Sequence, residues 1–381
     1  MPGSPGRCSC RTADTGGRRR RRSRVPSSSV SSRNLIRVRE CSSLPAWRSL
    51  NNFDWILFLA ILATCSVGLA VIYSATTGTP SAGAFHRQMT YAFYGIGLLF
   101  LALTLVFGRV VNASKSWLGA GGVQFQPSEI AKAATILMLA AYMGRERVRG
   151  LGVVHFAAIC LIIGLPVLLI MRQPDLGTAV TFAPLFAGVV FIGGIRVRTL
   201  LILGLIATLA LPMAWGHLKP YQKERVKTFL EPTRDPKGSG YQLIQSLIAV
   251  GSGGLLGKGF LAGTQGQLQF LPEQHTDFVF AVLAEERGFI GAMLALGLYF
   301  VIIYRCIATA RAARDRLGVF LAIGVVCVFA GQALLNIGVV VGLLPTTGVP
   351  LPLMSYGGSS LASTLLGMGL VLNVWMRRLV N

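Results

Sequence analysis

The chain has 381 residues, of which 53% are hydrophobic and only 13% are charged. Because about 25% of the residues of a soluble globular domain are charged, this composition excludes an ordinary soluble domain. The formal net charge is +22, and +10 of it comes from residues 1–50, where twelve arginines outnumber Asp14 and Glu40.

Residues 1–50 combine this arginine excess with serine runs, a composition typical of a disordered tail. A nucleic-acid-binding arm would carry the same charge, but a solvated tail or a wrongly assigned translation start explains the segment without a further partner. We therefore predict no nucleic-acid binding. The arginines precede a long polar stretch and not an apolar core, so the segment lacks the pattern of a signal peptide.

Long apolar runs follow the tail, and most have the roughly 17–25 residues that a helix needs to cross the hydrocarbon core of a bilayer. The pattern predicts an all-α polytopic membrane protein whose transmembrane domain occupies 51–381. The nine predicted spans are 55–75, 88–108, 129–143, 152–171, 177–194, 197–215, 278–304, 319–341 and 359–376.

Lysine and arginine mark the cytoplasmic loops of such proteins. Counting back from the basic C-terminus, the short basic loops alternate consistently with four loops on the outer side. These outer loops are 109–128, 172–176, 216–277 and 342–358. The same count puts the N-terminus outside, although it is the most basic segment of all. The charge pattern therefore predicts one span more than the nine found.

The longest outer loop, 216–277, is rich in basic residues that include Arg225 and Lys258. Long loops escape the charge rule, but the same residues would also form a basic basin for an anionic substrate, since Lys and Arg bind phosphates. The apolar residues of 241–250 share one helical face, which suits a helix on the outer bilayer surface or core packing equally. The glycine-rich segment 251–260 lacks the phosphate-loop pattern, so we reject nucleotide binding there.

The outer loop 342–358 contains three prolines, which forbid a regular helix. Irregular backbone at membrane depth is tolerated only where it is buried in protein or lines a cavity. Gln332 and Asn336 are four residues apart on the preceding span and share one of its faces. The pattern indicates either a polar cavity open to the outside or a plain proline-rich turn.

Acidic residues stand at three outer helix ends, Glu129, Asp175 and Asp277. Glu129 can pair with Lys132 at i, i+3, and an acid at a helix N-terminus also stabilises the helix dipole. Charges inside membrane spans, however, usually mark function. The acids Glu285 and Glu286 lie two turns beyond Asp277, and we assign them no catalytic role.

The histidines and cysteines point to no metal centre or disulfide framework. The four histidines are scattered without metal-ligand spacing, and none of the seven cysteines lies in a predicted outer loop. The sequence therefore leaves any metal site unknown.

Five segments together resemble the SEDS family, named for shape, elongation, division and sporulation. They are QPSEIAK at 126–132, QPDLGTA at 173–179, GYQLIQSLIAVGSGGLLGKG at 240–259, LPEQHTDFVFAVLAEE at 271–286 and GLLPTTGVPLPLMSYGGSS at 342–360. The resemblance covers about 54–378, and GVPLPL is similar to the rod-shape branch of the family, which acts in cell elongation. It implies a bundle of ten spans, one more than the nine found here.

The resemblance implies a peptidoglycan glycosyltransferase of the bacterial cytoplasmic membrane whose active site faces outside. Such enzymes polymerise lipid II, a disaccharide-peptide on a polyprenyl pyrophosphate, into a lipid-linked glycan. They work with a class B penicillin-binding protein, a transpeptidase, and with the membrane proteins of the elongation complex. The Asp of the HTDF motif, here Asp277, is implied to be catalytic, with Glu129, Lys132 and Asp175 supporting the cavity.

Two departures from the family pattern lie near 86–118. The segment 86–108 begins like the family's second span and ends like its third, so about one span's length is absent, in agreement with the charge count. Either the sequence is truncated internally or the early helices pack differently. Ser116 also stands where the family usually has an arginine, and Lys115 is the candidate to replace it.

The implied chemistry needs a base for the acceptor hydroxyl, because the pyrophosphate leaves readily. A positioned carboxylate supplies about 10²–10⁴-fold. Phosphate-binding candidates are Lys115, Arg225 and Lys258, assisted by a divalent cation, Mg or Mn, as the only predicted cofactor. Two other functions fit the polytopic pattern: a flippase for lipid-linked wall precursors and a non-catalytic scaffold of the wall-synthesis complex. The acids at the outer helix ends favour chemistry at the outer face.

Overall fold

A computed structural model describes residues 83–378 apart from short gaps. The gaps are 112–113, 121–122, 146–151, 196–204, 206–208, 210–219, 236–237, 261, 268–269 and 272. The predicted tail 1–50, the predicted span 55–75 and most of the predicted span 197–215 therefore lie outside the described residues.

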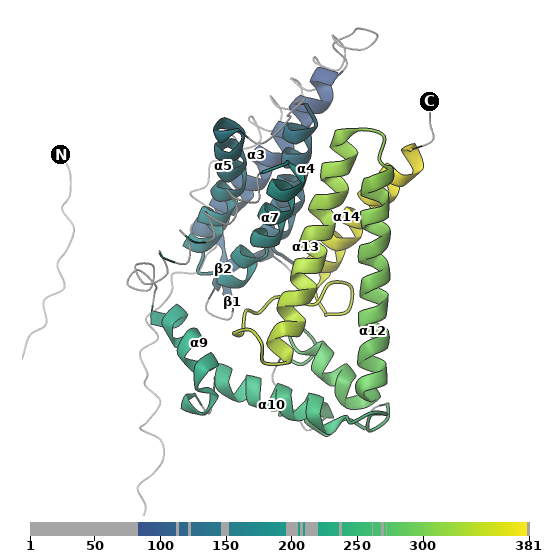
Figure 1. Ribbon diagram of the computed structural model, residues 1–381. Helices are drawn as coiled ribbons and strands as arrows, with labels where there is room; N and C mark the ends of the chain where they lie inside the picture. The colour runs from purple at the N-terminus through teal and green to yellow at the C-terminus, as the bar shows by residue number, and fades with distance from the viewer. Residues whose placement is uncertain are drawn as a thin grey trace, which may run out of the picture. The chain divides into compact units, whose positions relative to one another are not determined.

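The described chain is mainly helical (Figure 1). Its helices are α3 (Gly83–Phe107), α4 (Pro127–Arg145), α5 (Val153–Arg172), α6 (Leu176–Val180), α7 (Phe182–Ile192), α9 (Pro220–Leu230), α10 (Ser239–Ser252), α11 (Thr264–Gln267), α12 (Val279–Ala312), α13 (Arg316–Val340) and α14 (Gly358–Arg377), with a 3-10 turn at Pro232–Arg234. Within the described part, α3, α5, α12, α13 and α14 are long and apolar enough to cross a membrane. The prediction of a helical polytopic membrane protein is confirmed for this part of the chain, which also contains one small sheet.

Two predicted spans differ from a single apolar crossing. The predicted span 129–143 forms α4, which is not among the five helices above. The predicted span 177–194 is two helices, α6 and α7, separated at Thr181. The segment 86–108, predicted to combine two family spans, lies within the single helix α3 up to Phe107.

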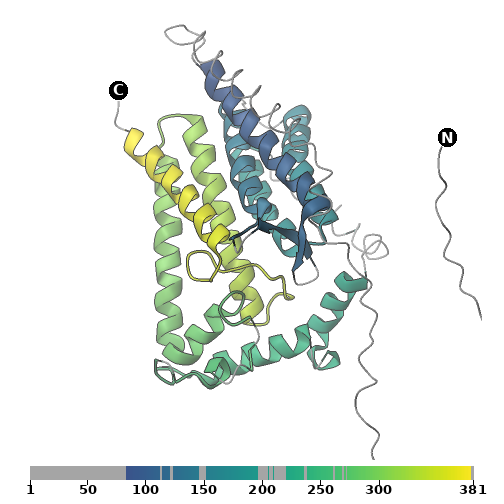
Figure 2. The same ribbon diagram turned by 180° about the vertical axis from the view of Figure 1, so that it is seen from behind.

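The predicted outer loop 109–128 contains a small antiparallel sheet that the sequence did not predict. Its strands are β1 (Arg109–Val111), β2 (Ser114–Ala120) and β3 (Val123–Phe125), and β2 lies in the middle. Arg109 is opposite Trp117, and Leu118 is opposite Phe125. The sheet contacts the ends of α3, α4 and α14 (Figure 2), so it continues the helical core without forming a separate layer.

Helix α13 is the centre of the bundle. In the most apolar 18-residue stretch of α13, 67% of the residues are buried, against 11–28% in the equivalent stretches of the four other candidate spans. It contacts α4, α7, α12 and α14, and glycines bring two of these helices close. A Cβ at Gly324 would lie 2.7 Å from Ile136 of α4, and one at Gly331 would lie 2.4 Å from Pro184 of α7. Small residues permit such close packing between membrane helices.

The described parts of the predicted inner and outer loops lie at opposite ends of the helices. At one end, Arg305 and Arg378 both lie over the ring of Trp375, with 5.0 Å and 3.1 Å from guanidinium carbon to ring centroid. At the other end, the predicted outer loops contact one another through side chains and main chain, as described below. The alternation inferred from charge is therefore consistent with the tertiary structure.

Helix α12 is broken at Gly288, which has φ 65° and ψ −162°. The loop after α10 completes the interrupted hydrogen bonding. The N–H groups of Phe289 and Ile290 donate to the carbonyls of Gly254 and Leu255, at 2.8 and 3.2 Å. On the other side of the break, the carbonyls of Glu285 and Glu286 accept from the N–H groups of Lys258 and Gly259, both at 3.0 Å.

This arrangement explains the glycine-rich segment 251–260, which the sequence reading could only exclude as a phosphate loop. A Cβ at Gly253 would lie 2.0 Å from the carbonyl oxygen of Ala284, and one at Gly257 would lie 2.2 Å from that of Glu286. The loop can reach the main chain of α12 only because these positions have no side chain. Such pairing is needed where backbone lies at membrane depth.

Substituting one glycine of this loop tests the close approach. We expect Gly257→Ala, at φ +83°, to lower the melting temperature of the purified protein in detergent more than Gly254→Ala, at φ +57°. Both carry the left-handed backbone cost of about 1–2 kcal/mol, but no atom lies within 4 Å of the Gly254 Cβ position. Equal losses in the two variants would show that the contact with α12 does not matter.

Candidate functional site

Asp277 ends a tight turn that leads into α12. The N–H groups of Thr276 and Asp277 both donate to the carbonyl of Glu273, at 3.2 and 3.1 Å. Glu273 itself has a φ of 54°. The turn therefore delivers Asp277 just outside the first residue of the helix, Val279, and not inside the span.

The loop Thr346–Val349 lies against this turn and is held by several elements that are distant in sequence. Arg225 of α9 donates from Nη1 to the carbonyl of Thr346 at 3.1 Å. Asn336 of α13 donates from Nδ2 to the carbonyls of Asp277 and Val349, at 2.7 and 2.8 Å. A Cβ at Gly177 would lie 2.0 Å from the Thr347 carbonyl oxygen. Helices α6, α9 and α13 thus meet at one loop beside Asp277.

The carboxyl group of Asp277 has a strongly raised pKa. Burial is the main cause, and the negative charge of Glu273 adds to it, while Arg225 and His275 act in the opposite direction. The balance raises the pKa from 3.8 to about 6. A carboxylate of this pKa is a stronger base than an exposed one and is still ionised at neutral pH.

Glu129 and Lys132 form a buried ion pair one turn into α4. The Lys132 ammonium lies 2.7 Å from Glu129 Oε1, and both side chains are at most 5% exposed. Lys132 also lines a pocket with Gln332 of α13 and with Ser363 and Thr364 of α14. Gln332 is one helical turn from Asn336, so both lie on one face of α13. That face therefore contacts Asp277 through Asn336 and lines the pocket through Gln332.

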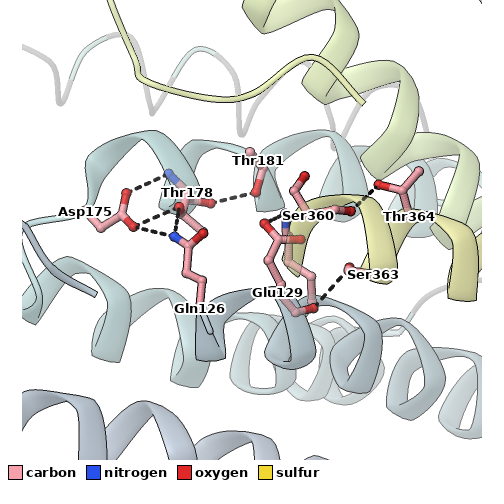
Figure 3. A network of polar contacts seen from close by, with 9 residues as sticks. Gln126, Glu129, Asp175, Thr178, Thr181, Ser360, Ser363 and Thr364 are labelled. Carbon is pink, nitrogen blue, oxygen red and sulfur yellow. Dashed lines mark hydrogen bonds and ion pairs between the residues drawn. The ribbon is translucent and has the colours of Figure 1, made fainter. Parts of the chain in front are cut away.

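Asp175 is the N-cap of α6 and contacts two predicted motifs at once (Figure 3). Its oxygens accept from the Thr178 N–H and hydroxyl, at 3.1 and 2.9 Å. The Gln126 amide donates to it at 3.3 Å. Asp175 therefore joins QPSEIAK to QPDLGTA, as an N-cap carboxylate can. Figure 3 also shows Ser363 beside Glu129, where its hydroxyl donates to the Glu129 carbonyl at 3.4 Å.

Lys258, a predicted phosphate ligand, is bound to the buried acid Glu285. The Lys258 ammonium lies 2.7 Å from Glu285 Oε1, and Glu285 is fully buried. The hydroxyl of Thr264 and the N–H of Gln265 donate to the same oxygen, at 3.0 and 3.1 Å. Glu285, which the sequence reading left without a role, thus fixes the loop 253–265 to the first part of α12.

The structure says less about Lys115 and about the predicted metal ion. Lys115 lies in β2, but its side chain is outside the described residues. Its neighbour Ser116, which stands at the family's usual arginine position, is buried. Among the described residues, no group of three or more His, Cys, Asp or Glu side chains could hold a metal ion. The predicted divalent cation therefore stays a prediction.

The sequence pattern of the FtsW/RodA/SpoVE family of cell cycle proteins matches residues 35–379. The chain belongs to this family. Similar members include the peptidoglycan glycosyltransferase MrdB of Escherichia coli K12, which is 42% identical over 75% of this chain and 77% of its own length. The stage V sporulation protein E of Bacillus subtilis is 37% identical over 84% of this chain and 96% of its length.

Solved structures of family members have the same fold. A peptidoglycan synthase complex that coordinates polymerisation and crosslinking contains a chain with a TM-score of 0.65 and 38% identity, covering 86% of this chain and 99% of that one. The rod shape determining protein RodA of Thermus thermophilus gives a TM-score of 0.56 and 33% identity, with 86% and 98% covered. The family resemblance read from the five motifs is confirmed.

Separating the two charges of the Lys258–Glu285 pair tests its role in stability. Lys258→Met leaves a buried carboxylate without its cation, so we expect a lower melting temperature. Removing one partner of a fully buried pair costs about 3–5 kcal/mol, and the 27% exposure of the Lys258 side chain puts the cost below that range. The double variant Lys258→Met/Glu285→Gln, which removes both charges, should recover part of the loss. If the double variant is no more stable than Lys258→Met, the unpaired Glu285 carboxylate is not the cause of the loss.

Proposed function

We propose that this chain is a peptidoglycan glycosyltransferase that polymerises lipid II into glycan strands during cell elongation, with Asp277 as the general base. The observation that carries the proposal is the position of the Asp277 carboxyl, which is half-buried beside Gly348 of the facing loop; burial there raises its pKa to about 6. It lies where the HTD turn meets the loop Thr346–Val349. The family members named as peptidoglycan glycosyltransferases support the reaction class.

The reaction joins an acceptor sugar hydroxyl to the anomeric carbon of a lipid-linked donor. Asp277 takes the hydroxyl proton as the new C–O bond forms, and the bond between the anomeric carbon and the pyrophosphate oxygen breaks. The pyrophosphate leaves as an anion, so a general acid is not required. A single displacement inverts the configuration and gives a β-linkage from an α-linked donor. The donor class, a polyprenyl pyrophosphate, is part of this proposal.

Basic residues near Asp277 would bind the pyrophosphate. Arg225 is close enough to lower the pKa of Asp277 and suits phosphate because its guanidinium can donate in pairs. Lys132 lies in the neighbouring pocket with Gln332, and Glu129 orients it. Mg²⁺ in such enzymes is usually held by one or two carboxylates and the substrate phosphates. The described residues hold no cluster of three or more acids, His or Cys for a metal ion, so such a cation would take most of its ligands from the substrate phosphates.

We place the active site on the outer face of the bacterial cytoplasmic membrane. The charge pattern supports this side, because the loops that surround Asp277 are those predicted to lie outside. A class B penicillin-binding protein that crosslinks the new glycan is the proposed partner, together with membrane proteins of the elongation complex. The similarity to a chain of a peptidoglycan synthase complex supports such a partner.

The alternatives are a flippase for lipid-linked precursors and a non-catalytic scaffold. A flippase needs polar groups along a path through the membrane. In the described chain, two of the buried acids are instead neutralised by lysine, Glu129 by Lys132 and Glu285 by Lys258. The raised pKa of Asp277 fits proton abstraction, which a scaffold does not require. We therefore favour the transferase.

Removing the carboxylate tests the proposal directly. We expect Asp277→Asn to reduce polymerisation of labelled lipid II by about 10²–10⁴-fold, the contribution of a general base. The assay uses the purified full chain with its penicillin-binding partner, and the glycan is separated by gel electrophoresis. Glu231→Gln, which changes an exposed acid at the end of α9, is the control and should retain activity. Full activity in Asp277→Asn would exclude the assigned base, and lipid II transfer across vesicles without polymer would support the flippase.

The pH dependence of the rate follows from the same group. A general base acts in its ionised form, so the rate should fall as the pH drops through the pKa of Asp277, about 6. Measured at saturating lipid II between pH 4.5 and 8, the rate should decrease about tenfold for each unit below that value. A rate that stays constant down to pH 5 would contradict the base assignment.

A further inference from the structure

Asn336 joins the two segments that form the site, and the proposed chemistry does not use it. Its side chain is only 1% exposed, in the central helix α13. Its Nδ2 donates to the Asp277 carbonyl at 2.7 Å and to the Val349 carbonyl at 2.8 Å. The opposite amide orientation would place Oδ1 against two carbonyl oxygens, so both contacts fix the side chain in one orientation.

We infer that Asn336 is a positioning residue for Asp277, holding the HTD turn against the loop Thr346–Val349 in the reactive arrangement. The inference rests on the proposed function, in which Asp277 is the base. Asp277 is the residue whose main chain Asn336 binds, and the second carbonyl bound belongs to the residue after Gly348. The two contacts therefore set the distance between the catalytic carboxylate and the loop that faces it.

The main chain of the loop lies close to the Asp277 carboxylate. Gly348 has a φ of 69°, and a Cβ built there would lie 3.5 Å from Asp277 Oδ2. This contact contributes to the burial that is the main cause of the raised pKa. If the loop separates from the turn, water reaches the carboxylate, and its pKa falls toward the ordinary value.

In the described part of the chain, the charged groups that act on Asp277 come from its own turn and from α9. The groups that shift its pKa are Glu273 and His275 of its own turn and Arg225 of α9. The loop Thr346–Val349 has no titratable side chain, and α13 contributes the neutral amide of Asn336. Loss of the amide should therefore change the solvation of Asp277 without removing any charge that faces it.

The remaining acceptor of Asn336 has no partner among the residues that the structure describes. Its Oδ1 is buried and accepts no hydrogen bond, which is unfavourable for an isolated amide. The side chain therefore acts at this site through its two donor contacts.

The test compares Asn336→Ala with Ser246→Ala in the full chain, with its penicillin-binding partner and labelled lipid II. Ser246 of α10 is a matched control, because it is fully buried and its hydroxyl donates to the Val340 carbonyl of α13 at 2.9 Å. Ser246→Ala thus loses one buried hydrogen bond from a side chain to a distant carbonyl, and Asn336→Ala loses two. Only the Asn336 bonds hold Asp277 and its facing loop.

We expect Asn336→Ala to lower kcat by about 10²-fold, the cost of a displacement of about 1 Å at a reacting group, with little change in KM. The acidic limb of its pH–rate profile should move from about pH 6 toward the ordinary pKa of a carboxyl. Ser246→Ala should keep the wild-type limb and most of the rate. An unchanged limb and rate in a folded Asn336→Ala overturns the inference, as do equal losses in both variants without a shift of the limb.

Two further variants keep the outcome interpretable. If Asn336→Ala does not fold, Asn336→Ser is read in the same way, since its short hydroxyl cannot donate to both carbonyls. Asp277→Asn separates the two proposals. An active Asp277→Asn would reject Asp277 as the general base. An inactive Asp277→Asn together with a fully active Asn336→Ala would reject only the positioning role of Asn336.

Discussion

Backbone inside a bilayer must find its hydrogen-bond partners within the protein, and the region around Asp277 satisfies this constraint across a break in α12. Helix α12 is interrupted at Gly288, and without other partners the interruption would leave N–H and C=O groups unpaired. The loop after α10 supplies these partners from its own main chain. The first part of α12 is therefore fixed to a segment outside the bundle, and Asp277 stands immediately before that part.

The acids of the site differ in how the protein compensates their charge. Glu129 and Glu285 are each paired with a lysine at 2.7 Å, and Asp175 caps a helix. Asp277 lies near a second acid, Glu273, and burial raises its pKa to about 6. A carboxyl with a raised folded-state pKa binds its proton more tightly when folded, so its ionised form costs stability above about pH 6. That cost disappears as the pH falls below the ordinary value of 3.8.

The loop Thr346–Val349 shows how distant segments form one site. Its carbonyls accept from Arg225 and Asn336, and its main chain lies against Gly177. These residues belong to α9, α13 and α6, so the loop joins three helices that are far apart in the sequence. Pro345 and Pro350 flank the loop and oppose helix formation there, which leaves the carbonyl groups available to these side chains.

The sequence by itself determined the membrane class, most helices of the described part and the family, because these depend on apolar run length, loop charge and local motifs. It also placed Asp277, Glu129 and Asp175 at helix ends, since helix starts follow local capping rules. The tertiary structure alone decided which groups pair. Lys258 binds Glu285 across 27 positions, and Asn336 reaches Asp277 across 59. Such pairs depend on packing between helices, and no local periodicity encodes them.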